Sequence, residues 1–432
     1  MRAARWFLAL AGTAISVAAL GGAWWALTLP PAPRSEGLEY STLVVDREGR
    51  LLRPYVTAEG RWRLPVALDD VDPRYVALLL AYEDRRFRSH PGVDALALAR
   101  AAWLWARNGR IVSGGSTLTM QVARLLEPRS ERTLAAKLRQ IVRAIELERT
   151  LSKDQVLELY FSLAPYGGNL EGVRAASLAY LGKEPRKVSL GEAALLVALP
   201  QSPEPRRPDR SPAQAQQARD RVLDRAAASG LLPADEVAQA KREPVPNGRK
   251  AMPALAPHAA DQALAAAPDK KLHRLTIDAH LQKNLEELAR DRARALGPDV
   301  SVAIVAVDHA SGEVRARVAS TDYFDERRAG QVDMTQALRS PGSALKPFIY
   351  GLAFEDGLVH PETLIEDRPL RYGAYAPENF DLTFQGTVSV RRALQLSLNV
   401  PSVALLEKVG ASRLTARLAQ AGAPLVLPKG EA

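Results

Sequence analysis

An uncharged stretch near the N-terminus constrains this chain more than any other feature. No charged residue lies between Trp6 and Leu29. At about 1.5 Å per residue, a helix over this stretch crosses a hydrocarbon core of about 30 Å. Arg2 and Arg5 precede the stretch, and the positive-inside rule then places the N-terminus in the cytoplasm. Pro30 ends the helix. Residues 1–33 are therefore predicted to form a cytoplasmic stub and a transmembrane anchor.

A cleaved signal peptide is the alternative interpretation of the same residues. The apolar run is longer than the hydrophobic region of most signal peptides. Trp24 and Trp25 lie near its end, where tryptophan prefers the membrane interface. These features favour an uncleaved anchor, and every residue after Pro33 is then expected outside the cytoplasmic membrane.

The composition narrows the range of functions. The chain has 432 residues, enough for two or three domains, and no cysteine, which excludes disulfides and thiol catalysis. Its net charge of +9 fits a surface that meets anionic lipid or pyrophosphate, although frequent use of arginine gives the same balance. No nucleic-acid recognition motif accompanies the charge, so we expect no nucleic-acid partner.

Changes in sequence pattern divide the rest of the chain. Residues 34–65 alternate apolar and polar side chains and are predicted to form a short β-rich connector. Residues 66–242 have mainly helical patterns. The first helix is predicted to begin with Asp72 as its N-cap and Pro73 at its first helical position. Residues 243–272 are rich in proline and alanine and are predicted to be a linker.

Residues 273–432 have mixed α/β character. Asp278 is predicted to cap a helix that runs to about Leu296. Two β-rich runs, residues 300–307 and 313–319, flank a turn signal and predict a hairpin. The chain is thus expected to be multidomain: a transmembrane anchor, a mainly α domain and an α/β domain.

One acidic residue of the helical domain stands at the edge of an apolar helix. Leu78 to Leu80 lead into Glu83, and Arg85, Arg86 and Arg88 follow. A carboxylate in such a place can act as a general base, and the arginines suit an anionic substrate. An ordinary charged helix end has the same composition, so this segment alone is weak support for a site.

Four further segments follow Glu83 in order. They are Gly114 to Gln121, Arg132 to Gln140, Leu157 to Ala176, and Leu190 to Pro200. The first is a glycine-led polar turn entering a helix, whose amides and hydroxyls suit a phosphate or a sugar. The second spaces cations along one helix.

The five segments together resemble the five motifs of the family 51 peptidoglycan glycosyltransferases, which have a lysozyme-like fold. The resemblance spans about residues 66 to 205. In that family the glutamate of the first motif is the general base for the acceptor's 4-hydroxyl, and the resemblance gives this role to Glu83. It further implies substrate-binding roles for Asp84, Arg85, Phe87, His90, Ser116, Thr117, Gln121, Arg132, Lys137, Gln140 and Glu158.

Gln140 departs from the family pattern. This position usually carries a glutamate that helps the pyrophosphate to leave, with a divalent cation such as Mg²⁺ or Mn²⁺ as a possible partner. An amide carries no charge to hold such an ion. We therefore expect no metal ligands here. Lys137, Arg139 and the arginines near Glu83 are expected to neutralise the leaving group instead.

A second candidate site lies in the α/β domain. Ser343 and Lys346 are one helical turn apart, so that a neutral lysine can act as the base for the serine. Ser397 and Asn399 follow with a hydroxyl and an amide. These residues resemble the first two active-site motifs of the penicillin-binding transpeptidases and serine β-lactamases. The resemblance implies that Ser343 is the acyl nucleophile, Lys346 its base, Ser397 a proton shuttle and Asn399 a substrate-binding residue.

The third motif of that family, a Lys-Thr-Gly or Lys-Ser-Gly strand, does not occur before Ala432. The transpeptidase-like α/β domain is therefore expected to be truncated at its C-terminus. We expect such a chain to react poorly with penicillin, because the missing strand supplies part of the oxyanion environment.

The anchor, the glycosyltransferase motifs and the serine–lysine pair together resemble a class A, bifunctional penicillin-binding protein. The segments Arg61 to Pro65 and Ala164 to Gly168 resemble those of the 1C type. The resemblance implies a single-pass protein of the bacterial inner membrane with periplasmic catalytic domains, which polymerises lipid II. Its partners would be lipid II, the growing lipid-linked glycan, the stem peptide, the membrane and, where the transpeptidase site is complete, β-lactams.

Two other functions remain open from the sequence. A lysozyme-like glycan hydrolase also uses one glutamate, and a non-catalytic scaffold of a wall-synthesis complex would tolerate Gln140 and the missing strand. The arginines around Glu83 and the anchor favour a pyrophosphate-linked donor over a neutral glycan.

Overall fold

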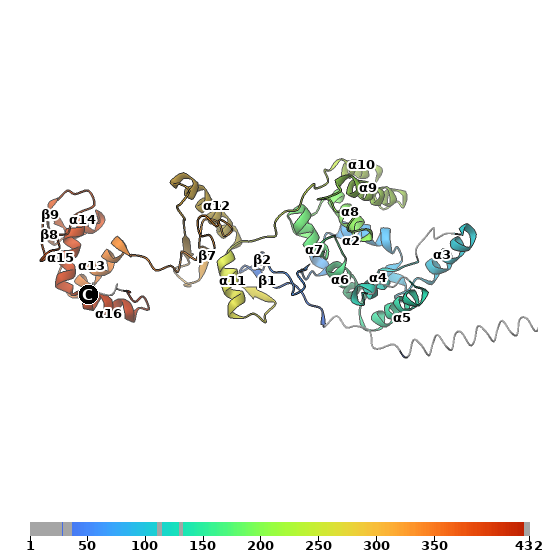
Figure 1. The fold of residues 1–432 in the computed structure, drawn as a ribbon, viewed down its shortest axis with the longest axis horizontal. Coiled ribbons are helices and arrows are strands. Elements are labelled where there is room, and N and C mark those ends of the chain that lie inside the picture. The colour runs from blue at the N-terminus through green and yellow to red at the C-terminus, as the bar shows by residue number, and fades with distance from the viewer. Residues whose placement is uncertain (1–27, 29–36, 110–114, 129–132, 427–432) are drawn as a thin grey trace, which may run out of the picture. The chain divides into compact units, whose positions relative to one another are not determined.

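The computed structural model describes residue 28 and residues 37–109, 115–128 and 133–426. Apart from Thr28, the predicted anchor lies outside these residues, as does Arg132. Over the described part of the chain, no helix is both long and apolar enough to cross a membrane. Contacts divide the chain into two compact units, residues 1–336 and 337–432 (Figure 1).

Helices form most of the first unit. Their bounds are Pro73–Glu83 (α2), Ala95–Asn108 (α3), Leu118–Leu126 (α4), Leu134–Thr150 (α5), Lys153–Leu163 (α6), Val173–Ala176 (α7), Leu190–Ala198 (α8), Pro212–Ala228 (α9), Ala234–Arg242 (α10), Pro257–Ala266 (α11) and Ala279–Leu296 (α12). Shorter turns join them at Leu68–Asp70 (η2), Phe87–Ser89 (η3), Ser177–Leu181 (η4), Pro185–Lys187 (η5) and Leu199–Gln201 (η6).

The helix starts follow capping chemistry. Asp72 accepts the Arg74 N–H at the start of α2, and Asp278 accepts two N–H groups at the start of α12, which confirms both predicted caps. Helix α11 lies within the stretch predicted as a linker. The alanines that suggested a linker are strong helix formers, and Pro257 occupies the first position of the helix.

Short strands tie distant parts of the first unit together. Strands Leu51–Pro54 (β2), Leu43–Val45 (β1) and Leu272–Arg274 (β5) form a sheet in that order, with β1 antiparallel to β2 and parallel to β5. Trp62–Arg63 (β3) pairs in parallel with Leu170–Glu171 (β4).

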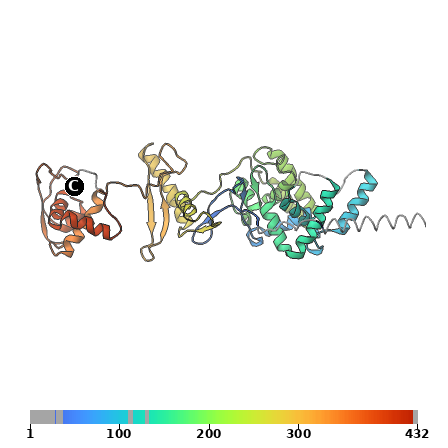
Figure 2. The same cartoon turned by 60° about the horizontal axis from the view of Figure 1, so that its bottom comes forward.

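The predicted hairpin is present. Ile304–Val307 (β6) and Val314–Val318 (β7) pair in antiparallel fashion, and Figure 2 shows the two strands beside α12.

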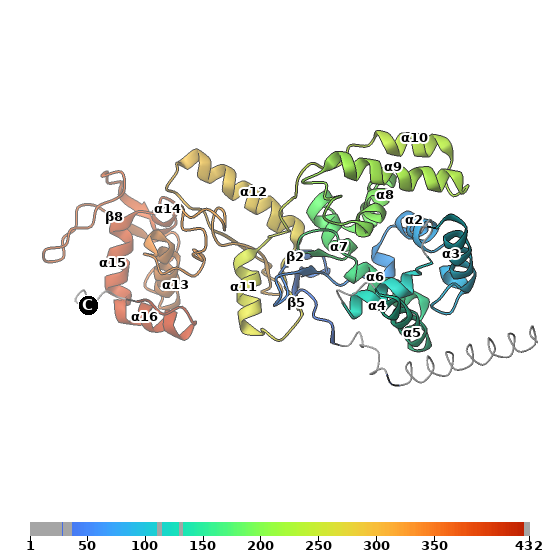
Figure 3. The same ribbon diagram turned by 45° about the vertical axis from the view of Figure 1, so that its right-hand side comes forward.

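The core of the first unit surrounds α8. Eight of the nine residues of this helix are buried, so it is apolar on every side and lies against α2 and α9 (Figure 1). Tyr75 from α2 is buried and lies with its hydroxyl 3.0 Å from that of Tyr166. Helices α4, α5 and α6 pack against one another on the other side of the unit (Figure 3). This packing holds the C-terminal end of α2 in place.

The second unit is a small helical cluster with one hairpin. Its elements are Gly342–Leu345 (η7), Lys346–Glu355 (α13), Leu364–Asp367 (β8), Gly386–Ser389 (β9), Val390–Gln395 (α14), Asn399–Val409 (α15) and Ala411–Gln420 (α16). Strands β8 and β9 are antiparallel. Helices α13 and α15 pack together, and Tyr350 and Leu405 are fully buried between the elements.

Gly92 controls how closely α5 approaches the loop before α3. Its φ of +83° is left-handed, and a Cβ at this position would collide with the carbonyl of Ala144. We predict that Gly92→Ala destabilises the protein by about 1–3 kcal/mol through this overpacking, in addition to the backbone strain. Gly60 has a φ of +75° and open space around it, so Gly60→Ala measures the strain alone. Equal losses of Tm for both variants would contradict this account of the packing.

Candidate active sites

Glu83 is the last residue of α2, and two side-chain amides hold its carboxylate. Gln121 Nε2 donates to Glu83 Oε2 at 2.9 Å, and Gln201 Nε2 donates to Glu83 Oε1 at 2.6 Å. Gln121 comes from α4 and Gln201 from η6, which are far apart in the sequence. The carboxylate is half-buried and lines a cavity of about 430 Å³.

The amide of Gln121 is placed by the cap of α4. Thr117 accepts the Met120 N–H at 3.1 Å and donates its hydroxyl to the Gly92 carbonyl at 2.6 Å. Thr117 is therefore a buried N-cap residue that joins α4 to the loop before α3. Its predicted role in substrate binding remains a prediction, because both of its polar bonds are internal.

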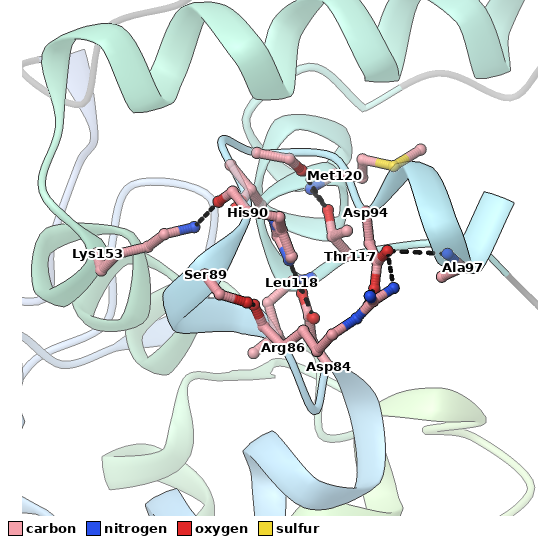
Figure 4. A network of polar contacts seen from close by, with 12 residues as sticks. Asp84, Arg86, Ser89, His90, Asp94, Ala97, Thr117, Leu118, Met120 and Lys153 are labelled. Atoms are coloured by element: carbon pink, nitrogen blue, oxygen red, sulfur yellow. Dashed lines mark hydrogen bonds and ion pairs between the residues drawn. The ribbon is translucent and has the colours of Figure 1, made fainter.

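Asp84, the residue after Glu83 in the sequence, forms a buried pair with His90 (Figure 4). His90 Nε2 lies 3.0 Å from both oxygens of Asp84, and the N–H of Leu118 donates to Asp84 at 3.0 Å. An ionised carboxylate only accepts hydrogen bonds, so Nε2 carries the proton. Lys153 donates to the His90 carbonyl at 2.6 Å. These contacts suit residues that position the site, and direct substrate contact by Asp84 or His90 stays a prediction.

The cavity beside Glu83 has a basic wall. Arg85, Arg86 and Arg100 line it together with Ser116. Arg85 is exposed, so its guanidinium is accessible to an anion. Arg86 is instead engaged with Asp94, donating from Nε at 3.0 Å and making a second contact through Nη2 (Figure 4).

Asp94 is buried and binds both the Arg86 side chain and the first turn of α3. It also accepts the Ala97 N–H at 2.8 Å. Burial alone would raise the pKa of Asp94, but the bonds from Arg86 and Ala97 outweigh it and lower the pKa below its usual value.

Lys137, on α5, contacts Ser116 in the wall of the cavity. Its ammonium donates to the Ser116 hydroxyl at 2.8 Å. Burial and then the positive charge of Arg124 lower the pKa of Lys137. A partly desolvated cation beside a polar turn is suited to an anionic oxygen, because it has little water to lose when the anion binds.

Arg139 makes an ion pair within the fold. Its Nε donates to Glu127 at 3.1 Å, so it ties α5 to the end of α4. Its expected part in neutralising a leaving group stays a prediction. Gln140 lies on the same helix and is half-buried. Among the described residues there is no cluster of three or more histidine or acidic side chains arranged to hold a metal ion, so we derive no step through a metal.

Two further predicted residues have packing contacts. Phe87 is buried in η3, and the Lys153 ammonium lies 4.4 Å from the centre of its ring. Glu158 on α6 accepts the Leu68 N–H at 3.1 Å and thereby caps η2. The bond of Glu158 is a structural contact, and Phe87 likewise has contacts typical of the core. The substrate-binding roles of both residues stay predictions.

The second candidate site centres on Lys346. This lysine is buried, and its ammonium donates to the Ser397 hydroxyl at 3.1 Å and to Asn399 Oδ1 at 2.6 Å, with a further contact to the Ser397 carbonyl. Burial lowers the pKa of Lys346. Ser343 is exposed in η7, one turn before Lys346. The fold thus brings together three of the four predicted residues and leaves the serine hydroxyl accessible.

A buried carboxylate supports this second motif. Asp367 is fully buried and accepts from Asn379 Nδ2 at 2.9 Å and from the Gln385 N–H at 2.7 Å. Asn379 Oδ1 in turn accepts the Asn399 N–H at 2.8 Å. Ser397 has a φ of +53°, which is unusual for a residue with a side chain. Through its bond to Asn399, the Asn379–Asp367 pair holds the turn that contains Ser397.

Two known families match the regions of the chain that contain the candidate sites. The transglycosylase family matches residues 48–227, and the penicillin-binding protein transpeptidase domain family matches residues 302–423. Penicillin-binding protein 1C of Escherichia coli (strain K12) is 47% identical over 410 residues, which are 95% of this chain and 53% of the relative. This chain belongs to the class A penicillin-binding proteins.

Other penicillin-binding proteins are similar over most of the chain. Penicillin-binding protein 1B of Vibrio cholerae is 33% identical, covering 83% of this chain and 49% of the relative. Penicillin-binding protein 1F of Bacillus subtilis is 28% identical, covering 86% of this chain and 54% of the relative. The chain spans about half the length of the curated relatives it matches.

Some residues of the penicillin-binding protein sites could not be found from the sequence. Gln201 directly follows the fifth glycosyltransferase motif, yet nothing in its local pattern indicates a bond to Glu83. Asp367 stands alone in its strand and gives no sign of its partner Asn379. Both contacts depend on chain segments that only the tertiary fold brings together.

We predict that Asp94→Asn lowers the Tm of this penicillin-binding protein in a pH-dependent way. The folded-state pKa of Asp94 is lowered, so its contribution to stability is fully present above the unfolded value of about 3.9 and is lost as pH falls through the lower folded value. Asparagine keeps an acceptor for Ala97 and removes the charge that binds Arg86. Thermal unfolding from pH 3 to 7 should show a gap that shrinks on acidification. A gap independent of pH would contradict the role of the charge.

Proposed function

We propose that this chain is a peptidoglycan glycosyltransferase that polymerises lipid II at the outer face of the bacterial inner membrane. The carrying observation is the Glu83 carboxylate, which lines a cavity walled by arginines and is held by two amides. The membership of the class A family and the match to the transglycosylase domain support the same activity.

The proposed reaction is a displacement at a sugar carbon. Glu83 accepts the proton of the acceptor's 4-hydroxyl as that oxygen bonds to the anomeric carbon of the lipid-linked donor. The bond from the anomeric carbon to the pyrophosphate oxygen breaks, and lipid pyrophosphate leaves with the electron pair. Arg85, Arg100 and Lys137 stabilise the charge on the leaving group.

Incubation of the purified protein with lipid II, followed by gel analysis of the glycans, separates the possible functions. Long polymer supports the glycosyltransferase. Shortened sacculus glycan would identify a lysozyme-like hydrolase, and no change in either substrate would identify a scaffold. The basic wall of the cavity favours the first outcome, because a neutral glycan has no charge for Arg85 and Arg100 to bind.

We predict that Glu83→Gln abolishes polymerisation with little loss of Tm. The amide keeps the shape of the side chain but cannot accept the proton, and a general base contributes about 10²- to 10⁴-fold to the rate. The measurement is the initial rate of lipid II consumption. A variant that keeps more than about a tenth of the wild-type rate would remove Glu83 from the role of base.

We predict that Lys137→Ala lowers the rate of polymerisation by about 10²- to 10³-fold, as for the loss of one electrostatic contact to a developing anion. Because cations take the place of a carboxylate-bound metal in this proposal, EDTA should leave the wild-type rate unchanged. Lys187→Ala, at an exposed lysine of η5 away from the cavity, is the matched control. Strong inhibition by EDTA that a divalent ion reverses would contradict the proposal.

We further propose acyl transfer by Ser343 as a second activity of the whole protein. Lys346 is buried, which favours the neutral form that a base needs, and it contacts the hydroxyl of Ser397. The stem peptide is the proposed substrate, and β-lactams are the proposed inhibitors.

We predict that any fluorescent penicillin bound covalently by this chain is bound through Ser343. Ser343→Ala should abolish the label, and Lys346→Met should reduce it strongly, because the nucleophile then lacks its base. The measurement is in-gel fluorescence after denaturation. Label that persists in Ser343→Ala would exclude this residue as the nucleophile.

A further inference from the structure

We infer that Gln201 is a positioning residue for Glu83: its side-chain amide, held in one orientation by Arg206 and Tyr82, fixes the carboxylate and favours its ionised form. The inference rests on the proposed function of Glu83 as a general base. It assigns a residue of η6, which follows the fifth motif, a role in positioning the glutamate of the first motif.

The geometry divides the carboxylate evenly between two amides. Gln201 Nε2 donates to Oε1 at 2.6 Å, and Gln121 Nε2 donates to Oε2 at 2.9 Å. A carboxylate has about four lone-pair sites, so two remain for other partners. With both oxygens held, the carboxylate cannot rotate freely, and the remaining lone pairs keep a fixed direction toward a substrate hydroxyl.

The orientation of the Gln201 amide is itself determined by its neighbours. Arg206 Nη1 donates to Gln201 Oε1 at 3.2 Å, and the Tyr82 hydroxyl donates to the same oxygen at 3.5 Å. A guanidinium has only donors, so it binds the amide oxygen and leaves the NH₂ group facing Glu83. A flipped amide would place its oxygen against the carboxylate, and the two acceptors would repel each other.

Two further contacts hold these neighbours in place. Arg206 Nη1 also donates to the Ala198 carbonyl at 2.6 Å, which ties it to the end of α8. The Arg225 guanidinium from α9 lies 4.8 Å from the centre of the Tyr82 ring. The chain of contacts therefore runs from α8 and α9 through Gln201 to the C-terminal residue of α2.

The amide matters most when substrate fills the cavity. Gln201 is exposed in this structure, and water weakens its bond to Glu83. A bound substrate that excludes water lowers the local dielectric and strengthens the same bond. Since a donor that binds the charged form of a carboxylate favours that form, Gln201 keeps the base ionised while the reaction proceeds.

Other titratable groups face Glu83 and bear on any pH profile. On the cavity side they are Asp84, Arg85, Arg86, Asp94 and Arg100, with His90 bonded to Asp84. On the other side they are Tyr75, Tyr82, Tyr160 and Arg206. Asp84, Asp94 and His90 are the carboxylates and the imidazole of this set, so a control variant must leave all three intact.

The kinetic test is the pH profile of kcat for polymerisation by Gln201→Leu, because kcat reports the groups of the substrate-bound enzyme. Removing the donor should lower kcat about tenfold at neutral pH with KM little changed, and should move the acidic limb of the profile upward. Gln217→Leu, at an exposed glutamine of α9, keeps the wild-type profile. Asp84, Asp94 and His90 are intact in both variants, so only the loss of the Gln201 amide distinguishes them.

The role of Arg206 is tested in two backgrounds. As a single variant, Arg206→Met should move the acidic limb in the same direction as Gln201→Leu does. In the double variant, Arg206→Met should cause no further movement beyond that of Gln201→Leu. A fall in rate without any shift of the limb in Gln201→Leu would identify a purely structural role and overturn the inference.

A double-mutant cycle, measured by thermal unfolding, tests the bond between Gln201 and Glu83 without any substrate. Tm is measured from pH 4 to 7 for the wild type, Glu83→Gln, Gln201→Leu and the double variant. The coupling between the two positions should be larger at pH 7 than at pH 4, because Gln201 binds the anion, which is lost on acidification. No coupling at any pH would overturn the inference even where lipid II is polymerised. Coupling without polymerisation would overturn only the proposed function on which it rests.

Discussion

A buried carboxylate behind the glycosyltransferase site is the interaction on which the rest of that site depends. Asp84 follows Glu83 directly and binds both the His90 ring and the first N–H of α4. An unpaired charge at this depth would be costly, so the loop and the helix must meet Asp84 for the domain to fold. The same meeting brings Gln121 of α4 to Glu83. Stability and the geometry of the proposed base therefore come from one set of contacts.

The two candidate sites share a physical design. In each, a buried aspartate accepts hydrogen bonds from backbone and side-chain donors and thereby holds a neighbouring polar motif, Asp84 beside Glu83 and Asp367 beneath Asn399. In each, a partly desolvated lysine contacts a serine hydroxyl, Lys137 in the first and Lys346 in the second. Burial lowers the pKa of both lysines, but only the second lies one turn from an accessible nucleophile.

Much of the fold and part of the site could be predicted from local sequence. The caps at Asp72 and Asp278 and the hairpin of β6 and β7 follow from short-range chemistry, and the structure has all three. Motif spacing also predicts Glu83 and Lys346 as site residues, and the structure places Glu83 in a cavity wall and Lys346 beside Ser397. The contact of Arg139 with Glu127, at the end of α4, could not be predicted, because sequence spacing does not reveal pairs between segments that only the fold brings together.

The sequence by itself determined the family, the order of the domains and the residue types at both sites, because these depend on motifs read along the chain. Only the tertiary structure decided which charges are engaged and which face the cavity. Arg86 is bound by Asp94 while Arg85 is exposed, although the two are adjacent in sequence. Gln201 reaches Glu83 because α8 packs against α2. Hydrogen bonds and burial depend on distances in space, and a linear pattern does not contain them.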